Sequence, residues 1–259
     1  DELESLLHRL GYRREGRDDD GPPLHPEGRR AVFVGDFVDR GPKVVGTARL
    51  VMQMVESGAA LAVPGNHDVE MAHRLRAAGD RLTEAGPGTR LSFDQIAALS
   101  RAEARDFQAR FAEFVAALPT HLMLDRGRLA VAHAGLKREF IGRESEAVRR
   151  FALHGEVTGG LDRHGLPVRI NWARAYRGKT FVVYGHTPVR RPERIGNTMN
   201  VDTGCVYGGA LTALRWPEQS TLSVRAPRPY YVSPRVRIAG VGLRAATRHD
   251  PRPPAAPRA

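Results

Sequence analysis

The sequence predicts an α/β sandwich, and three patterns lead to this fold class. In the first half of the chain, short β-type runs alternate with longer segments in which apolar residues recur at helical spacing. In the second half, short β-type runs dominate and end in Gly, Asp or His. The 259 residues are enough to bury a sizeable core. Such a pattern is typical of sheets covered by helices, with functional loops at the strand ends.

The first half of the chain opens on leucines at helical spacing, followed by Gly11, which is placed to end that helix. A polar segment rich in Gly and Pro leads into the first apolar run, AVFV. We expect GNHD to be a turn and residues 79–100 to be irregular. The predicted elements are a helix over 1–12, a strand over 31–34, a helix over 44–56, a strand over 61–63, and helices over 69–78 and 102–117.

After Pro119 the pattern changes to short β-type runs, and the last two of these predict a hairpin. We expect one domain over residues 1–232 and a tail rich in Pro and Arg over 233–259, which its composition predicts to be disordered. The runs are HLMLD at 121–125, RLAVAHAG at 128–135, TFVVYGH at 180–186, ALTALRW at 210–216 and EQSTLSVRA at 218–226.

Composition is that of a globular protein, with 41% hydrophobic and 27% charged residues. No apolar run approaches the ~18 residues of a membrane helix, and no signal peptide is visible, so we expect a cytoplasmic protein with no membrane partner. The single cysteine, Cys205, excludes an intrachain disulfide.

The formal net charge of +11 suggests an anionic partner. However, only Lys43, Lys137 and Lys179 are lysines, and such an arginine excess is also typical of a GC-rich genome. Residues 225–259 carry eight arginines and one acid, Asp250. This tail is either an arm that attracts nucleic acid or a merely solvated end.

Polar residues cluster in five loops, each of which follows an apolar run in the sequence. Asp, Asn and His are ligands for Mn, Fe, Ni or Zn, and the neighbouring glycines permit tight turns. One such loop alone is an ordinary turn, and one His after a strand is more often a hydrogen-bonded core residue than a ligand. Five in order indicate a common site. They are GDFVDRG at 35–41, GNHD at 65–68, AHAG at 132–135, YGHTP at 184–188 and VDTGC at 201–205.

The order GDxxDRG, GNH[DE], His and GH resembles that of the calcineurin-like metallophosphoesterases. GDFVDRG is similar to the branch that holds the Ser/Thr phosphoprotein phosphatases and the symmetrical dinucleoside tetraphosphatases. HGEVTGGLDRHGLPVRINWARAYRG, VVYGHTPV and VDTGCVYGGALTALRWPE resemble the phosphatase domain of bacterial polynucleotide kinase–phosphatase, an RNA end-healing enzyme. The resemblance implies a metallophosphoesterase-type sandwich of two mixed sheets flanked by helices, in four α/β/β/α layers.

The resemblance also implies roles for the matching residues. Asp36 would bridge two divalent metal ions (Mn, Ni, Fe or Zn), and Asn66, His133 and His186 would complete the second metal site. The hydroxide that bridges the two ions would attack phosphorus directly. No nucleophilic Ser or Cys is then needed, and we read Cys205 as structural.

The same resemblance supplies the groups that handle the phosphate. His67 would be the general acid, oriented by Asp39. Arg40 would clamp the phosphate, because a guanidinium matches its geometry with two parallel hydrogen bonds, and Asn66 would also contact substrate. Asp202 lies in a family motif near the site, without a definite role.

One family motif is missing from this sequence. Family members carry GD-x-HG a few residues before a helix that resembles ELESLLHRLGY, and its Asp and His are the private ligands of the first metal. We therefore expect a fragment without its first strand, in which only one metal site has its ligands and phosphatase activity is impaired.

The main reading is a metal-dependent phosphatase of RNA 3′ ends, which heals 2′- and 3′-phosphates, with flanking kinase and ligase domains in a full-length protein. The sequence leaves open a protein Ser/Thr phosphatase and a symmetrical dinucleoside tetraphosphatase. Outside the enzymes it leaves open an inactive fragment that binds nucleic acid.

Overall fold

A five-stranded mixed sheet forms the centre of the molecule. The computed structural model describes residues 1–14, 21–77, 86–162, 165 and 167–233. The three inner strands of the sheet are parallel and the two edge strands are antiparallel to them. Its order is β3 (Leu122–Leu124), β4 (Leu129–Val131), β7 (Phe181–Tyr184), β9 (Thr198–Asn200) and β8 (Glu193–Ile195).

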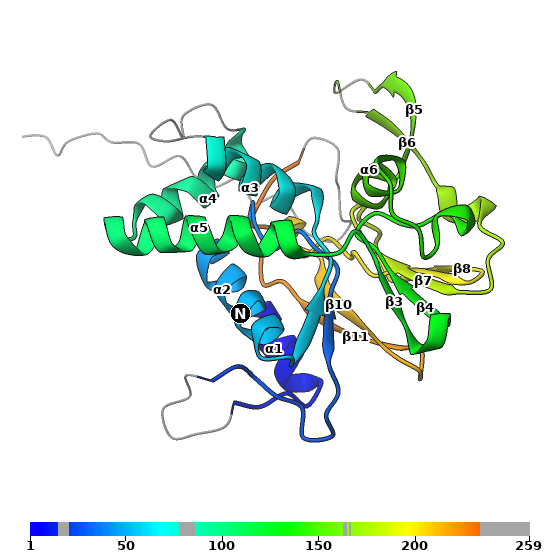
Figure 1. Cartoon of the computed structure of the whole chain (residues 1–259), viewed down its shortest axis with the longest axis horizontal. Helices are drawn as coiled ribbons and strands as arrows, with labels where there is room; N and C mark the ends of the chain where they lie inside the picture. The colour runs from blue at the N-terminus through cyan, green and yellow to red at the C-terminus, as the bar shows by residue number, and fades with distance from the viewer. Residues whose placement is uncertain (15–20, 78–85, 163–164, 166, 234–259) are drawn as a thin grey trace, which may run out of the picture.

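A second β layer packs on one face of this sheet (Figure 1). It contains the parallel pair β1 (Ala31–Phe33) and β2 (Ala60–Ala62), and the predicted hairpin of β10 (Ala210–Arg215) and β11 (Ser220–Arg225). Val32 and Leu214 from this layer contact the sheet cluster that includes Val183. The layer is not the continuous mixed sheet that we expected: β1–β2 and β10–β11 are separate pairs in the described part of the chain.

Helices cover both outer faces, so the four-layer α/β/β/α order is confirmed. α1 (Glu2–Arg9) and α2 (Val44–Glu56) cover the second β layer through Leu7, Leu50 and Met54. α6 (Glu146–His154) covers the far face of the five-stranded sheet, together with the 3₁₀ turn Trp172–Ala175. Three more helices, α3 (Asn66–Ala77), α4 (Pro87–Ala97) and α5 (Arg101–Ala117), pack with α2 around one apolar cluster.

The chain departs from our expectations at two helices beside the site. Residues 79–100 are not irregular throughout, because α4 occupies residues 87–97. Pro87 stands in the first turn, where its fixed φ suits a helix, and buried Phe93 and Ile96 hold the helix against α2 and α5. GNHD is not a free turn either, since α3 begins at Asn66. Tertiary packing overrides the weak local signal in both places.

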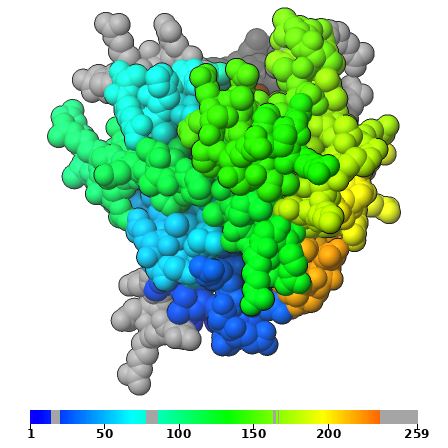
Figure 2. All heavy atoms as spheres, turned by 45° about the vertical axis from the view of Figure 1, so that its right-hand side comes forward, coloured from blue at the N-terminus to red at the C-terminus, as the bar shows by residue number. Residues whose placement is uncertain are grey.

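The remaining described elements are one hairpin and three further 3₁₀ turns. The antiparallel hairpin of β5 (Glu156–Leu161) and β6 (Pro167–Ile170) was not predicted; it stands out from the body next to α6 (Figures 1 and 2). Further 3₁₀ turns occupy Asp125–Gly127, Arg138–Phe140 and Cys205–Tyr207. Within the described ranges, no helix is long and apolar enough to cross a membrane. The predicted tail lies outside the described residues, apart from Ser233.

Candidate metal and phosphate site

Strand ends bring the predicted polar residues together. Asp36 follows β1, and Asn66 follows β2 as the first residue of α3. His133 and His186 follow the neighbouring parallel strands β4 and β7. Parallel strands end at the same edge of a sheet, so their following loops converge there.

Four ligand atoms meet around the buried ring of His133. Its Nε2 lies 2.9 Å from His186 Nδ1, 3.2 Å from Asn66 Oδ1 and 3.5 Å from Asp36 Oδ2. Ligand atoms of Asp36, His133 and His186 all lie within 4.8 Å of one another. Metal–nitrogen bonds are about 2.0–2.1 Å long, so neighbouring ligands on one ion lie roughly 3 Å apart. The spacing and the mixed N/O donor set therefore fit one divalent transition-metal ion.

Hydrogen bonds set the orientation of both histidines. His133 Nδ1–H donates to the Val34 carbonyl over 2.8 Å, which leaves the Nε2 lone pair toward the cluster, as in many metal sites. Arg169 on β6 contacts His186 Nε2 through its guanidinium. Because a guanidinium only donates, ligation through His186 Nδ1 would require this contact to open. Burial, and then the charges of His133 and Arg169, lower the pKa of His186 and keep it neutral, which is the ligating form.

A second cluster lies around the buried side chain of Asp39. His67 Nδ1–H donates to its carboxylate over 2.6 Å. Thr89 and Ser92 from α4 donate their hydroxyls over 2.8 and 2.9 Å. Burial raises the pKa of Asp39, but these hydrogen bonds outweigh it and lower the pKa overall. Burial also lowers the pKa of His67, but the Asp39 bond and the Asp36 charge outweigh it and raise the pKa overall.

Arg40 lies beside this cluster and beside two aromatic rings. Its backbone N–H donates to the Gly88 carbonyl over 3.1 Å. Its guanidinium carbon lies 5.9 Å from the ring centre of Tyr207 and 5.6 Å from that of Tyr231. Both distances are within the range of cation–π attraction.

Asp68 connects the GDFVDRG loop to the GNHD loop through backbone hydrogen bonds. Its side chain is fully buried, and it accepts backbone hydrogen bonds from Asp36, Phe37 and Gly65 at 2.7, 2.8 and 2.7 Å. Burial and the charge of Asp36 raise the pKa of Asp68 to about 8, although the three N–H donors favour its ionised form. Asp68 therefore ties the Asp36 loop to the start of α3.

Asp202 and Cys205 do not belong to the group of ligand atoms around His133. The Asp202 carboxylate accepts the backbone N–H of Gly204 over 3.0 Å and so shapes the turn into Cys205–Tyr207. Burial, more than any other effect, raises its pKa. Burial also raises the pKa of Cys205 to about 12, so its thiol is protonated at neutral pH. This agrees with a structural Cys205.

Sequence patterns missed four contributions to the site: Asp68 as a tie between loops, Thr89 and Ser92 on α4, Arg169 on β6, and the tyrosines beside Arg40. Asp68 lies in the predicted GNHD loop, but nothing in the local pattern marks its role, and the other three contributions have no local signal. Thr89 and Ser92 belong to a segment that we expected to be irregular, and Arg169 belongs to a hairpin that we did not predict.

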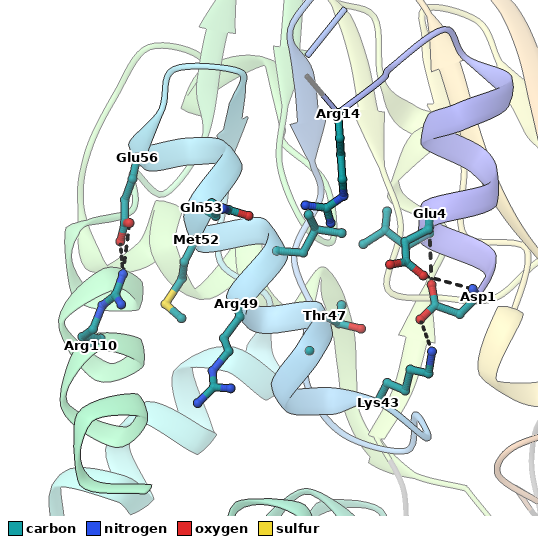
Figure 3. A pocket seen from close by; sticks show the side chains of 13 residues that line it. Asp1, Glu4, Arg14, Lys43, Thr47, Arg49, Met52, Gln53, Glu56 and Arg110 are labelled. Atoms are coloured by element: carbon teal, nitrogen blue, oxygen red, sulfur yellow. Dashed lines mark hydrogen bonds and ion pairs between the residues drawn. The ribbon is translucent and has the colours of Figure 1, made fainter. Parts of the chain in front are cut away.

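A separate groove of about 580 Å³ lies between α1 and α2 (Figure 3). Charges of both signs line it, with ion pairs of Lys43 to Asp1 (3.5 Å) and of Arg110 to Glu56 (3.1 Å). No ligand of the metal cluster lines this groove. We therefore place the site at the strand ends, where ligand atoms converge.

Comparisons with known proteins identify the family of the chain. Residues 1–190 match the model of the calcineurin-like phosphoesterase family. The chain is 42% identical over 229 residues to an asymmetrical bis(5′-nucleosyl)-tetraphosphatase PrpE from Geobacillus sp. (strain WCH70), covering 88% of this chain and 91% of that protein. It is 40% identical over 230 residues to the protein of the same name from Bacillus subtilis (strain 168), covering 89% and 91%.

Two solved structures share the fold. One is provisionally described as a diadenosine tetraphosphatase, with a TM-score of 0.56, 23% identity and coverage of 87% of each chain. The other is a Ser/Thr phosphatase from Saccharomyces cerevisiae, with a TM-score of 0.51, 16% identity and coverage of 87% of this chain and 75% of that one. At these identities the likeness concerns the fold alone.

The relatives correct the narrower of our two resemblances. Their names state a tetraphosphatase, whereas the second half of the sequence suggested a polynucleotide kinase–phosphatase. The broader resemblance is confirmed by the family match, by the fold and by ligand atoms that suit a divalent ion. The chain therefore belongs to the calcineurin-like phosphoesterase family and is a metal-dependent hydrolase of phosphate esters.

Proposed function

We propose that this chain hydrolyses dinucleoside tetraphosphates and cuts the four-phosphate chain off centre. The observation that carries this proposal is the 40–42% identity, over about nine tenths of both chains, to proteins named asymmetrical bis(5′-nucleosyl)-tetraphosphatases. A dinucleoside tetraphosphatase was one of the alternatives that the sequence left open, although that alternative was the symmetrical kind.

In this proposal, Asp36, Asn66, His133 and His186 hold a divalent ion. When bound, the ion acts as a Lewis acid on a phosphate oxygen and lowers the pKa of water at the site. His133 is already oriented for this by its bond to Val34.

The remaining groups act on the phosphate chain. Arg40 binds a phosphate with two parallel hydrogen bonds. His67 keeps Nδ1–H on Asp39, so its Nε2 holds the proton that passes to the leaving phosphate oxygen. Its raised pKa favours the protonated form that this step needs.

The test is a product assay with diadenosine tetraphosphate and Mn²⁺, beside an RNA with a 3′-phosphate and a Ser/Thr phosphopeptide. Off-centre cleavage yields ATP and AMP, whereas central cleavage yields two ADP. We expect ATP and AMP, and loss of both products in Asp36→Asn. A preference for the RNA end would restore the RNA-repair reading, and a preference for the phosphopeptide would favour a protein phosphatase. RNA binding that survives chelation, without turnover of any substrate, would favour the non-enzymatic reading.

A further inference from the structure

We propose that Tyr207 and Tyr231 form a stacking platform for one nucleobase of the substrate, next to the phosphate-binding Arg40. This inference rests on the proposed function and deepens it. Tyr207 closes the 3₁₀ turn that follows Asp202, and Tyr231 lies in the segment after β11. Their ring centres are 6.3 Å apart at an interplanar angle of 65°, an edge-to-face arrangement, so a base that stacks on one ring would meet the other ring at an angle.

The two rings are held together by backbone hydrogen bonds. Tyr230 and Tyr231 both donate their N–H groups to the Val206 carbonyl over 2.9 Å. Ala226 donates to the Gly209 carbonyl, also over 2.9 Å, which aligns the segment with the turn. The Tyr230 hydroxyl donates to Glu2 and connects the segment to α1. The platform is thus preformed rather than assembled from independent side chains.

Neither ring is needed to fill the core. Tyr207 and Tyr231 are only partly buried, and neither belongs to a hydrophobic core cluster of the described residues. Their hydroxyls have no hydrogen-bond partner in the described part of the chain, whereas those of Tyr176 and Tyr230 have one each. Partly exposed aromatic rings of this kind can stack with a ligand, and every nucleobase has a π face that can stack on them.

The position suits a nucleotide, because its base and its phosphate are joined by a single sugar. The Arg40 guanidinium carbon lies 5.6 and 5.9 Å from the two ring centres. Arg40 directly follows Asp39, which binds His67, so the two rings lie next to the groups that handle the phosphate. A phosphate held by Arg40 would carry its base to these rings.

A simpler role is that the rings only position Arg40. The two roles differ in what they predict for a ligand without a base. If the rings position Arg40, their loss weakens the binding of every polyphosphate. If they stack a base, their loss weakens only nucleotides.

The experiment compares Tyr207→Ala, Tyr231→Ala, Tyr207→Phe and Tyr231→Phe with the wild-type chain. KM is measured for diadenosine tetraphosphate, and the inhibition constant is measured for inorganic tetraphosphate, which has no base. We expect each Ala variant to raise KM about 5- to 100-fold, with the inorganic tetraphosphate constant within about twofold. The Phe variants keep the ring and should stay near wild type. Tyr176→Phe is the matched control, because it removes a tyrosine hydroxyl bond in a hydrophobic core cluster and leaves both rings and their backbone bonds in place.

Unchanged KM in the Ala variants would overturn the platform, and so would an equal rise in KM and in the inorganic tetraphosphate constant. Thermal unfolding of each variant identifies any loss of folding. If the wild-type chain cleaves no dinucleoside polyphosphate, the proposed function fails by itself. Calorimetric binding of ATP against inorganic triphosphate then decides the platform: weaker ATP binding alone in the Ala variants supports it, and any other pattern rejects it.

Discussion

Backbone strain is concentrated at single residues of the site. Seven described non-glycine residues have positive φ, and Asp36, Asp39, Arg40 and His186 are four of them, with φ between 58° and 71°. This conformation costs a non-glycine residue about 1–2 kcal/mol. Such strain persists where surrounding contacts hold it, as the bonds of Asp68 to the Asp36 loop do. The local cost is consistent with a loop shaped for binding rather than for stability.

The substitution Arg40→Lys tests whether the planar shape of the guanidinium or its charge alone holds the phosphate. Arg40→Lys keeps the charge but removes the planar fork and its stacking on Tyr207 and Tyr231. Losing one charged hydrogen bond costs about 1.5–3 kcal/mol, so we expect kcat/KM for diadenosine tetraphosphate to fall about 10- to 100-fold. Steady-state kinetics measures this. Arg49→Lys on the exposed face of α2 is the control and should keep full activity. Wild-type kinetics in Arg40→Lys would show that charge alone suffices.

Asp39 links the site to stability at low pH. Its pKa in the folded protein lies below the ordinary value of 3.8, so its stabilising effect is complete above pH 4 and is lost as pH falls through the lowered pKa. Asp39→Asn replaces one buried acceptor oxygen with an NH2 donor and should lower the free energy of unfolding by about 1–3 kcal/mol at pH 7. Urea unfolding at pH 7 and pH 3 measures both proteins, and we expect the difference to shrink at pH 3. A difference that does not depend on pH would contradict this account.

At the scale of elements, the starts of α3 and α4 bring the loops of the site into place. α3 begins at Asn66 and carries Asp68 below the Asp36 loop. α4 presents Thr89 and Ser92 to Asp39, and the Gly88 carbonyl to Arg40. Both helices thus hold backbone or side-chain groups that lie 31 to 53 residues away along the chain. The loops are held by elements that the local pattern signals only weakly.

Close backbone approach between the first two loops requires glycine. Gly35 has a φ of +85°, and a Cβ there would lie 2.3 Å from the Gly65 nitrogen. Gly35→Ala must therefore push backbone against backbone, and we expect a loss of more than about 2 kcal/mol in the free energy of unfolding, together with weaker metal binding. Urea unfolding and calorimetry measure the two effects.

Gly46→Ala is the matched control for this substitution. Gly46 is exposed within α2, and a Cβ there meets nothing within 4 Å. Because alanine suits a helix interior better, the control should gain about 0.5–1 kcal/mol. A Gly35→Ala protein as stable as wild type would show that the loops can move apart.

At the scale of the whole molecule, the candidate metal ligands come from both β layers. Asp36 and Asn66 come from the β1–β2 pair, whereas His133 and His186 come from the five-stranded sheet. An ion bound by all four would hold the layers together. It would stabilise the folded state by about 2.7 kcal/mol at an ion concentration of 100 times its Kd.

We expect Mn²⁺ to raise the unfolding midpoint of the wild-type chain, with one ion bound tightly per chain. The described residues contain one group of His, Cys, Asp and Glu that could hold an ion. His186→Ala should lose most of the midpoint shift because it removes a ligand from one layer. Calorimetric titration gives the stoichiometry. Two tightly bound ions per chain, or a full shift in His186→Ala, would contradict this assignment.

Much of the fold follows from local pattern, whereas the ligand set came from family motifs. Apolar periodicity predicted α2, α5 and the hairpin of β10 and β11, because spacing alone decides which face of an element is buried. The residues after β1, β4 and β7 were predicted as ligands because their motifs resemble those of the calcineurin-like metallophosphoesterases. The RNA-end reading rested on resemblance alone, and the relatives do not support it.

The sequence by itself determined which chemistry the chain carries: the order of five polar loops and the residue types at their tips. Only the tertiary structure decided which atoms meet. The Asp68 carboxylate accepts a backbone N–H of the Asp36 loop, and α4 donates a hydroxyl to Asp39. The Arg40 guanidinium lies beside Tyr207 and Tyr231. These contacts join residues from 31 to 191 positions apart, and neither propensity nor period carries information over such separations. They exist because burying the apolar faces of two β layers brings distant strand ends to one edge.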